Sequence, residues 1–324
     1  VNLKPLLSNS ALAFRGYNVT NLGRSRELLT DPRYADTVRE GLQDGTDICQ
    51  EVLPRPGDLV KRGLDGREAT LDEYGEAIAL IMAMEHAHLR LLAEVHELDP
   101  RQARASFGFS LGEISALVAG GLFSLTDALR VPLAMAEDSA SLAHDVTMGI
   151  VFSRGESIPM EKAKALCLEI NAENRGVIGI SAHLSPNSFL LLGTSDTIQR
   201  YRDRIGDILS KRIFLRVNEH HWPPLHTPIV WEKCIPNRAS KMLHTIPSKP
   251  ARPQPEVISM LDGTACYTET NTRDVIGKWI DHTQRLWDAI NTLLVMGIDT
   301  IIHVGPQPNI IPATFDRLAA NVEL

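Results

Sequence analysis

The chain has 324 residues, of which 44% are hydrophobic and 23% are charged, and its formal net charge is −7 at pH 7. This is the composition of a soluble globular protein, and the acidic balance argues against a nucleic-acid-binding protein. No apolar run approaches the length of a membrane span, so we expect no membrane association. The cysteines lack the spacing of a metal site or a disulfide framework, and they fit a reducing compartment such as the cytoplasm.

The first third of the chain predicts strands and helices in alternation. Residues 11–16 are expected to form a strand that runs into a glycine-containing loop. The apolar residues of 71–96 recur at helical spacing and predict a long, packed helix. Residues 104–109 fit a further strand, and 111–120 fit a helix. A strand, a tight turn and a helix therefore follow one another directly.

The turn between this strand and this helix reads Gly-Phe-Ser-Leu-Gly-Glu, residues 108–113. A serine with glycine two residues away on each side suits a sharp strand-to-helix turn that exposes its hydroxyl. The helix N-terminus behind it offers unpaired N–H groups to a developing oxyanion. We interpret Ser110 as a nucleophile for acyl transfer through a covalent intermediate. The competing interpretation is an ordinary glycine-rich turn.

The middle of the chain, residues 146–218, predicts a small inserted unit. Its elements are expected in the order β-α-β-β-α-β, which is typical of a ferredoxin-like fold. The strands are predicted at 148–153, 177–182, 188–192 and 212–217, and the helices at 159–170 and 195–210 with Ser195 as the N-cap.

The flanking parts, 1–145 and 219–324, alternate strands and helices, including a helical stretch at 272–296 and a strand at 300–304. This alternation predicts a parallel α/β sheet with helices on both faces. We therefore expect an α/β-hydrolase-like catalytic domain built from both flanking parts, with the ferredoxin-like subdomain at 146–218.

Several short motifs, in this order, resemble one known family. Residues 108–121 resemble its serine motif, and Phe-Arg-Gly-Tyr-Asn at 14–18 stands where the family has F-P-G-Q-G. Residues 225–230, Leu-His-Thr-Pro-Ile-Val, resemble its F-H-S-P-L-M motif, and 303–306 resemble its late V-G-P strand end. Over nearly the whole chain, the sequence resembles the malonyl-CoA:acyl-carrier-protein transacylases and the acyltransferase domains of polyketide synthases.

This resemblance implies a reaction and residues to perform it. Ser110 would accept an acyl group from a thioester, and His226 would be the general base of a Ser-His dyad. A backbone carbonyl near residues 280–281 would orient the imidazole. The oxyanion hole would consist of the backbone N–H groups of Leu111 and Tyr17.

The histidine assignment has alternatives, because His220 and His221 lie close to His226 in the sequence. The Thr-Pro-Ile-Val that follows His226 favours it. Three nearby histidines also suggest a zinc site, but no cysteine or carboxylate cluster at ligand spacing accompanies them, so we predict no metal.

The sequence departs from the family at the expected substrate pocket. Malonyl-specific members carry an arginine that pairs with the malonyl carboxylate, and counting from the serine places Met135 there. Arg130 is the nearest cation on the same helical segment, 126–136. Phe109 and Leu184 also replace polar residues of the family. Since an unpaired buried carboxylate is costly, we expect a non-malonyl, uncharged acyl group, such as an acetyl, fatty, polyketide or aminoacyl-derived group.

The implied partners are an acyl-CoA or acyl-carrier thioester and the phosphopantetheine thiol of an acyl carrier protein, with no bound cofactor. A basic docking face for the carrier is expected on the later part of the insert, at Arg200, Arg202, Arg204, Lys211 and Arg212. The chain is expected to be a monomer or part of a synthase complex.

Other functions stay open from the sequence. These are a malonyl transacylase with an atypical pocket, a serine hydrolase of acyl thioesters, and a degenerate relative that serves only as a docking module.

Overall fold

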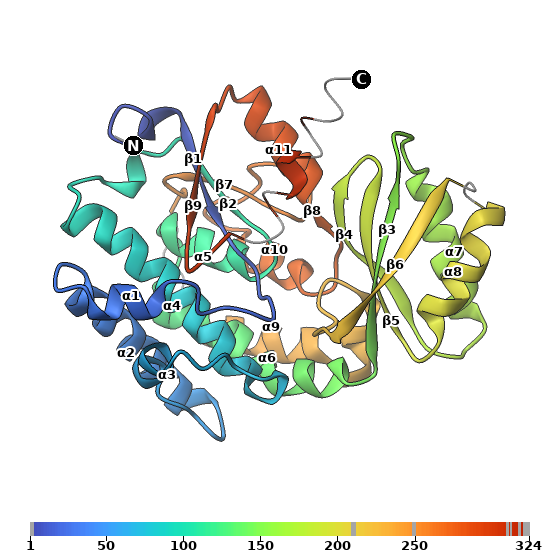
Figure 1. The fold of residues 1–324 in the computed structure, drawn as a ribbon, viewed down its shortest axis with the longest axis horizontal. Coiled ribbons are helices and arrows are strands. Elements are labelled where there is room, and N and C mark those ends of the chain that lie inside the picture. Colours follow the sequence, from blue (N-terminus) through green and yellow to red (C-terminus); the bar gives the residue numbers. More distant parts are fainter. Residues whose placement is uncertain are drawn as a thin grey trace.

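The computed structural model describes residues 3–208, 212–247 and 251–308, together with 311, 313–316 and 319. These residues form two β-sheets that lie side by side, each with its own helices (Figure 1). The predicted fold class, α/β with a parallel sheet and a second, smaller unit, is confirmed.

The first sheet has four parallel strands in the order β7-β2-β1-β9. They are β1 (Ser10–Phe14), β2 (Ala105–Gly108), β7 (Glu256–Ile258) and β9 (Thr300–Val304). In the register of the sheet, the last residue of β1, Phe14, lies opposite Gly108 of β2 and Val304 of β9. The carboxyl ends of these strands therefore meet at one edge, where the loops that follow them come together.

Helices cover the first sheet. They are α1 (Ser25–Thr30), α2 (Ala35–Val52), α3 (Leu59–Asp65), α4 (Tyr74–Glu94), α5 (Leu111–Ala119), α6 (Leu125–Ala143), α9 (Ile235–Thr245), α10 (Thr272–Trp279) and α11 (Leu286–Val295). Short 3-10 turns are η1 (Leu7–Asn9), η2 (Leu71–Glu73), η3 (Pro100–Gln102) and η4 (Pro228–Lys233). None of the described helices combines the length and the apolar character that crossing a bilayer requires.

Successive side chains of β1 point to opposite faces of the sheet and therefore belong to two different cores. Leu12 and Phe14 belong to a large core with residues of α2, α4, α5 and α6. Ala11 and Ala13 belong to another core, which contains residues of α11 and of the second sheet. Both faces of the parallel sheet are therefore buried, as its almost wholly apolar strands predict.

The second sheet has four antiparallel strands in the order β6-β3-β5-β4. Its elements are β3 (Val146–Ser153), α7 (Met160–Ala172), β4 (Ile178–Ser185), β5 (Ser188–Thr194), α8 (Thr197–Ile208) and β6 (Ile213–His221). This is the predicted β-α-β-β-α-β order. Helices α7 and α8 cover its outer face, around a core that includes Val151, Phe189 and Tyr201 (Figure 1).

One predicted boundary in this unit is wrong. Helix α8 begins at Thr197, and the Ser195 hydroxyl donates to Asp145 Oδ2 at 3.5 Å instead of capping the helix. Ser195 has a positive φ of 54°, which places it in the turn before the helix. The predicted helix end at Ser210 lies outside the described residues.

A short strand, β8 (Gln284–Arg285), ties the two sheets together and interrupts the helical stretch that was predicted at 272–296. It pairs in parallel with β4 at Ala182 and His183. The N–H of Arg285 donates to the carbonyl of Met260, just after β7, at 2.7 Å. Main-chain hydrogen bonds thus link the second sheet to the residue that follows shortly after β7, the edge strand of the first sheet.

The turn after β2 requires glycine at two positions. A Cβ at Gly108 would lie 2.0 Å from the carbonyl carbon of Gly112, and a Cβ at Gly112 would lie 2.4 Å from the carbonyl oxygen of Phe14. Both contacts are with backbone atoms, which cannot move aside. The two glycines of the serine motif are therefore explained by close backbone approach.

The buried carboxyl of Glu113 anchors the start of α5. It accepts hydrogen bonds from Ser259 Oγ at 2.6 Å, Tyr267 Oη at 2.7 Å and the Met260 N–H at 3.1 Å. Burial raises the pKa of Glu113 to about 7 despite these donors. Glu113 therefore binds the loop after β7 to the turn that carries Ser110.

We predict that Gly108→Ala destabilises the fold by at least about 3 kcal/mol, because the added Cβ overlaps with backbone. Gly206→Ala in α8 is the matched control: nothing lies within 4 Å of its Cβ position, and we expect a gain of about 0.5–1 kcal/mol. Urea unfolding followed by circular dichroism measures both changes. Equal stability of Gly108→Ala and the parent would contradict the close approach.

Candidate active site

Ser110 stands at the tip of the turn between β2 and α5. Its backbone has φ 55° and ψ −118°, a strained conformation for a residue with a side chain. Its hydroxyl Oγ lies 2.7 Å from Nε2 of His226, which is 116 residues away in the sequence. The turn thus presents the serine hydroxyl to an imidazole, the geometry of an activated nucleophile.

His226 lies in the loop between β6 and η4 and also has a positive φ, of 67°. Its backbone N–H donates to the carbonyl of Ile280 at 2.7 Å, and its ring Nδ1 lies 2.7 Å from the carbonyl oxygen of Trp279. Since a carbonyl only accepts, Nδ1 carries the ring hydrogen, and the lone pair on Nε2 is free to take the Ser110 proton.

The expectation that the orienting carbonyl lies at 280–281 is therefore wrong by one residue. The carbonyl of Trp279 accepts from the ring, while the carbonyl of Ile280 accepts from the backbone of His226. Trp279 is the last residue of α10, where carbonyls have no partner within the helix.

Burial controls the protonation of His226. It lowers the pKa of the imidazole to about 4, and the Trp279 carbonyl and the Asp281 charge only partly oppose this effect. The imidazole is consequently neutral near pH 7. A neutral imidazole is the form that can remove a proton from a serine hydroxyl.

The segment that contains Trp279 and Ile280 also binds the backbone of Ser110. The indole Nε1–H of Trp279 donates to the carbonyl of Ser110 at 3.2 Å, and the N–H of Ser110 donates to Gln284 Oε1 at 3.1 Å. The Trp279 ring meets the imidazole of His226 edge to face, with ring centroids 5.0 Å apart. Residues 279–284 therefore position both members of the pair.

Two backbone N–H groups lie close to Ser110. Leu111 is the first residue of α5, so its N–H has no acceptor within the helix. The loop after β1 runs against the turn: a Cβ at Gly16 would lie 2.7 Å from the Phe109 carbonyl oxygen and 3.3 Å from Ser110 Cβ. Tyr17 follows at once and lines the same cavity as Ser110. The start of α5 and the loop after β1 thus both lie beside the turn that carries Ser110.

The side chain of Arg15 holds the loop after β1 by hydrogen bonds. Its guanidinium donates to the carbonyls of Gly16 at 3.1 Å and Thr20 at 2.9 Å, and to Asn21 Oδ1 at 3.1 Å. Its backbone N–H donates to Glu85 at 2.8 Å, and burial raises the pKa of Glu85 to about 8. The residue that replaces the family proline therefore holds the loop by hydrogen bonds.

A cavity of about 380 Å³ opens above the Ser110–His226 pair. Residues from both sheets line it: Tyr17, Asn18, Tyr74, Phe109, Ser110, Met148, Ile150, Ser181, Leu190, Leu192, Asn218, Trp222, Pro223, Leu225 and His226. These lining residues include no lysine, arginine, aspartate or glutamate. The cavity therefore suits an uncharged, mainly apolar group.

Of the four pocket residues expected from the sequence, only Phe109 lines this cavity. Met135 on α6 and Leu184 on β4 are buried in the two cores beside the first sheet. Arg130 is one turn from the start of α6, where it donates to Glu51 at 2.5 Å and to Asp127 at 3.3 Å. Counting from the serine placed Met135 in the pocket, but on α6 its side chain turns into the large core. Leu184, expected from its replacement of a family asparagine, and Arg130 also do not line the cavity.

Four further residues of the site escaped sequence reasoning: Tyr74, Trp222, Trp279 and Gln284. Trp222 lies four residues before His226, so the histidine motif could have drawn attention to it. The other three come from separate elements and carry no local motif. Only the folded chain brings them to Ser110.

His220 and His221, the alternative histidines, are exposed at the end of β6. The His221 ring lies 3.3 Å from the Val146 carbonyl, not beside the serine. His226 is thus the histidine that contacts Ser110. Across the part of the chain that the structure describes, no three potential ligand side chains gather to hold a metal ion.

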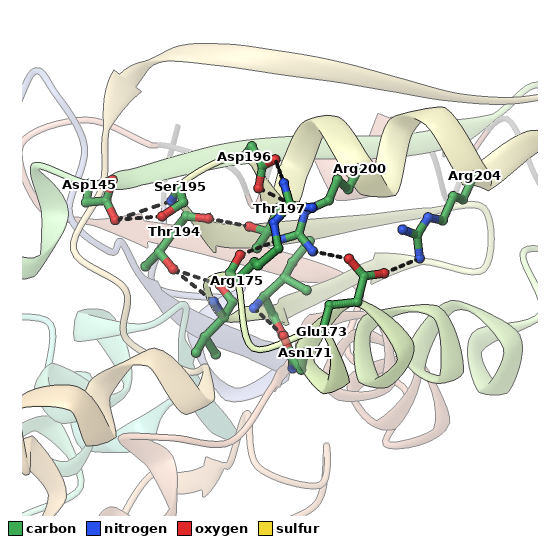
Figure 2. A network of polar contacts seen from close by, with 12 residues as sticks. Asp145, Asn171, Glu173, Arg175, Thr194, Ser195, Asp196, Thr197, Arg200 and Arg204 are labelled. Carbon is green, nitrogen blue, oxygen red and sulfur yellow. Dashed lines mark hydrogen bonds and ion pairs between the residues drawn. The ribbon is translucent and has the colours of Figure 1, made fainter.

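The basic face expected on α8 is largely neutralised by ion pairs (Figure 2). Arg200 contacts Asp196 at 2.9 Å and Glu173 at 2.6 Å, and Arg204 contacts Glu173 at 2.6 Å. Arg175 pairs with Asp196 at 3.0 Å. These arginines bind α8 to the end of α7, so they offer little free positive charge to an acidic partner.

Three members of that expected face remain. Arg202 is exposed on α8. Arg212 contacts Glu156 at 2.9 Å. Lys211 lies outside the described residues.

The depressed pKa of His226 predicts how the reactivity of Ser110 depends on pH. The rate of Ser110 modification by a fluorophosphonate should stay constant from pH 8 down to about pH 5, then fall with a midpoint near 4, since protonation removes the base. Mass spectrometry of the labelled protein measures the rate, and circular dichroism confirms folding at each pH. A midpoint near 6.5 would show that burial does not shift this imidazole.

The indole of Trp279 predicts a second effect. Trp279→Phe keeps an aromatic ring and the backbone carbonyl but removes the indole N–H that donates to the carbonyl of Ser110. It should slow Ser110 labelling about five- to tenfold. The matched control is Trp287→Phe on α11, which lies outside residues 279–284 and does not line the cavity, so it should leave the rate unchanged. An unchanged midpoint of the pH profile would separate lost positioning of the serine from a changed base.

No family model matches the chain. Polyketide synthase GfsA of Streptomyces halstedii is 24% identical over 302 residues, which are 91% of this chain but 4% of that protein. The chain spans less than half the length of the curated relatives that it matches.

The solved structures agree with the curated relatives. The malonyl-CoA:acyl carrier protein transacylase of Xanthomonas oryzae superimposes with a TM-score of 0.78 at 18% identity, covering 97% of this chain and 92% of that one. A malonyl-transacylase in complex with its type II polyketide synthase acyl carrier protein gives 0.75 at 17% identity, with 97% and 94% covered. The predicted resemblance is confirmed: the relatives and structural neighbours of this chain are malonyl-CoA:acyl carrier protein transacylases and polyketide synthase acyltransferases, and it shares their fold.

Proposed function

We propose that this chain is an S-acyltransferase that moves an uncharged acyl group from a CoA or carrier-protein thioester, through an ester on Ser110, to the phosphopantetheine thiol of an acyl carrier protein. The observation that carries this proposal is the contact of 2.7 Å between Ser110 Oγ and the neutral, buried imidazole of His226. The chemistry occurs at the base of an uncharged cavity.

In the first half-reaction, Ser110 Oγ attacks the thioester carbonyl while Nε2 of His226 takes the hydroxyl proton. The N–H groups of Leu111 and Tyr17 receive the negative charge that develops on the carbonyl oxygen. The carbon–sulfur bond then breaks, and His226 returns the proton to the departing thiolate. The products are an acyl-Ser110 ester and a free thiol.

In the second half-reaction, the thiol of the carrier arm takes the position of the departed thiol. His226 removes its proton, the sulfur attacks the ester carbonyl, and the proton returns to Ser110 Oγ as the carbon–oxygen bond breaks. An acyl carrier protein as acceptor is supported by the relatives, one of which is a malonyl-transacylase in complex with such a carrier.

An uncharged acyl group is supported by the residues around the cavity. A malonyl carboxylate would be buried among side chains that carry no positive charge, and an unpaired buried carboxylate is costly. Arg130, the cation nearest to the expected position, pairs with Glu51 and Asp127 instead.

Loading of Ser110 by thioesters tests the proposal. We predict that acetyl-CoA adds its acyl mass to the protein, that Ser110→Ala shows no adduct, and that malonyl-CoA loads at least about 100-fold more slowly, equivalent to about 2.7 kcal/mol. Intact-protein mass spectrometry measures each rate, and holo acyl carrier protein should then discharge the adduct.

The other outcomes assign other functions. Efficient loading by malonyl-CoA would identify a malonyl transacylase with an atypical pocket. Discharge at the same rate with and without the carrier protein would identify a thioester hydrolase.

A further inference from the structure

Three aromatic rings from distant parts of the chain form one wall of the cavity above Ser110. They are Tyr17 in the loop after β1, Tyr74 at the start of α4, and Trp222 after β6. The Tyr17 and Tyr74 rings meet at 89° with centroids 4.8 Å apart, and the Tyr17 and Trp222 rings meet at 79° with centroids 6.0 Å apart. These are edge-to-face contacts, which hold each ring in a defined orientation.

Tyr74 closes one end of this cavity. Its side chain is almost completely buried, and its residue also lines a separate surface groove, whose other lining residues include the charged Asp72, Glu73 and Glu137. The tyrosine therefore stands as a partition between the cavity and the groove. A long linear acyl chain that extended from Ser110 in this direction would meet the partition.

The size of the cavity bears on the acyl group as well. At about 380 Å³ it leaves room for a ring-sized group beside the thiol end of the carrier arm, whereas an acetyl group would contact little of the wall.

We propose that the acyl group is compact, apolar and ring-sized, an aryl group in the first instance, and that it packs against Tyr17, Tyr74 and Trp222. This inference rests on the proposed function, because it names the substrate of the same reaction. Edge-to-face and offset-stacked contacts with these rings favour an aryl group over aliphatic groups of other shapes. The remaining polar side chains at the wall, Asn18, Ser181 and Asn218, are uncharged.

The rate of Ser110 loading from a set of CoA thioesters tests the proposal. We expect benzoyl-CoA to load about tenfold or more faster than either acetyl-CoA or hexadecanoyl-CoA. Acetyl or hexadecanoyl loading as fast as benzoyl loading would overturn the inference while leaving the acyltransferase proposal in place. Absence of any adduct with all three thioesters would instead refute the proposed function, and this inference with it.

Substitution of Trp222 tests whether the rings hold the acyl group. Trp222→Ala should lower the ratio of benzoyl to acetyl loading about tenfold, because it removes one face of the wall. Trp287→Ala on α11 is the matched control: this indole lies outside residues 279–284 and does not line the cavity, so the ratio should stay at the parent value. An unchanged ratio in Trp222→Ala would overturn the inference.

Discussion

Four hydrogen bonds from one short segment hold the Ser110–His226 pair together. The carbonyls of Trp279 and Ile280 accept from the ring and the backbone of His226, while the Trp279 indole and the Gln284 amide bind the two peptide groups of Ser110. Both paired residues have positive φ, a strain that costs of order 1–3 kcal/mol each. These hydrogen bonds hold both strained residues in place, so that Ser110 Oγ and His226 Nε2, from distant parts of the sequence, lie 2.7 Å apart. Their contact therefore depends on residues 279–284.

Burial gives the pair its electrostatic character and limits what can bind beside it. The surroundings that lower the pKa of His226 to about 4 also disfavour any other unpaired charge. An acyl group with a carboxylate would need a cation in the wall, and the lining residues provide none. A neutral imidazole and a cavity wall without charged side chains are thus two features of one desolvated site.

The sequence predicted the parts of this site whose signals are local. Ser110 stands in a motif that is recognisable from its local pattern of glycines, although Gly112 is required by the approach of Phe14 from β1. The alternation within 146–218 predicted the order of elements in the second sheet. Met135 and Arg130 were misplaced because counting residues does not give the direction in which a helix turns a side chain. Arg130 binds Glu51 of α2, a partner that no local pattern predicts. Tyr74 escaped notice for the same reason: it reads as an ordinary apolar position of α4, and only the packing of α4 against the loop of Tyr17 makes it part of the cavity.

The inserted unit completes the site, although it supplies neither of the paired residues. Met148 and Ile150 of β3 and Leu190 and Leu192 of β5 line the cavity opposite the loops of the parallel sheet. These residues alternate along their strands, so one face of the second sheet points to the cavity while the other packs against α7 and α8. The turn after β2 therefore provides Ser110, the loop after β6 provides His226, and the insert forms part of the cavity wall above them. Because β8 joins the two sheets at Gln284, which also binds the backbone of Ser110, a shift of the insert would disturb both at once.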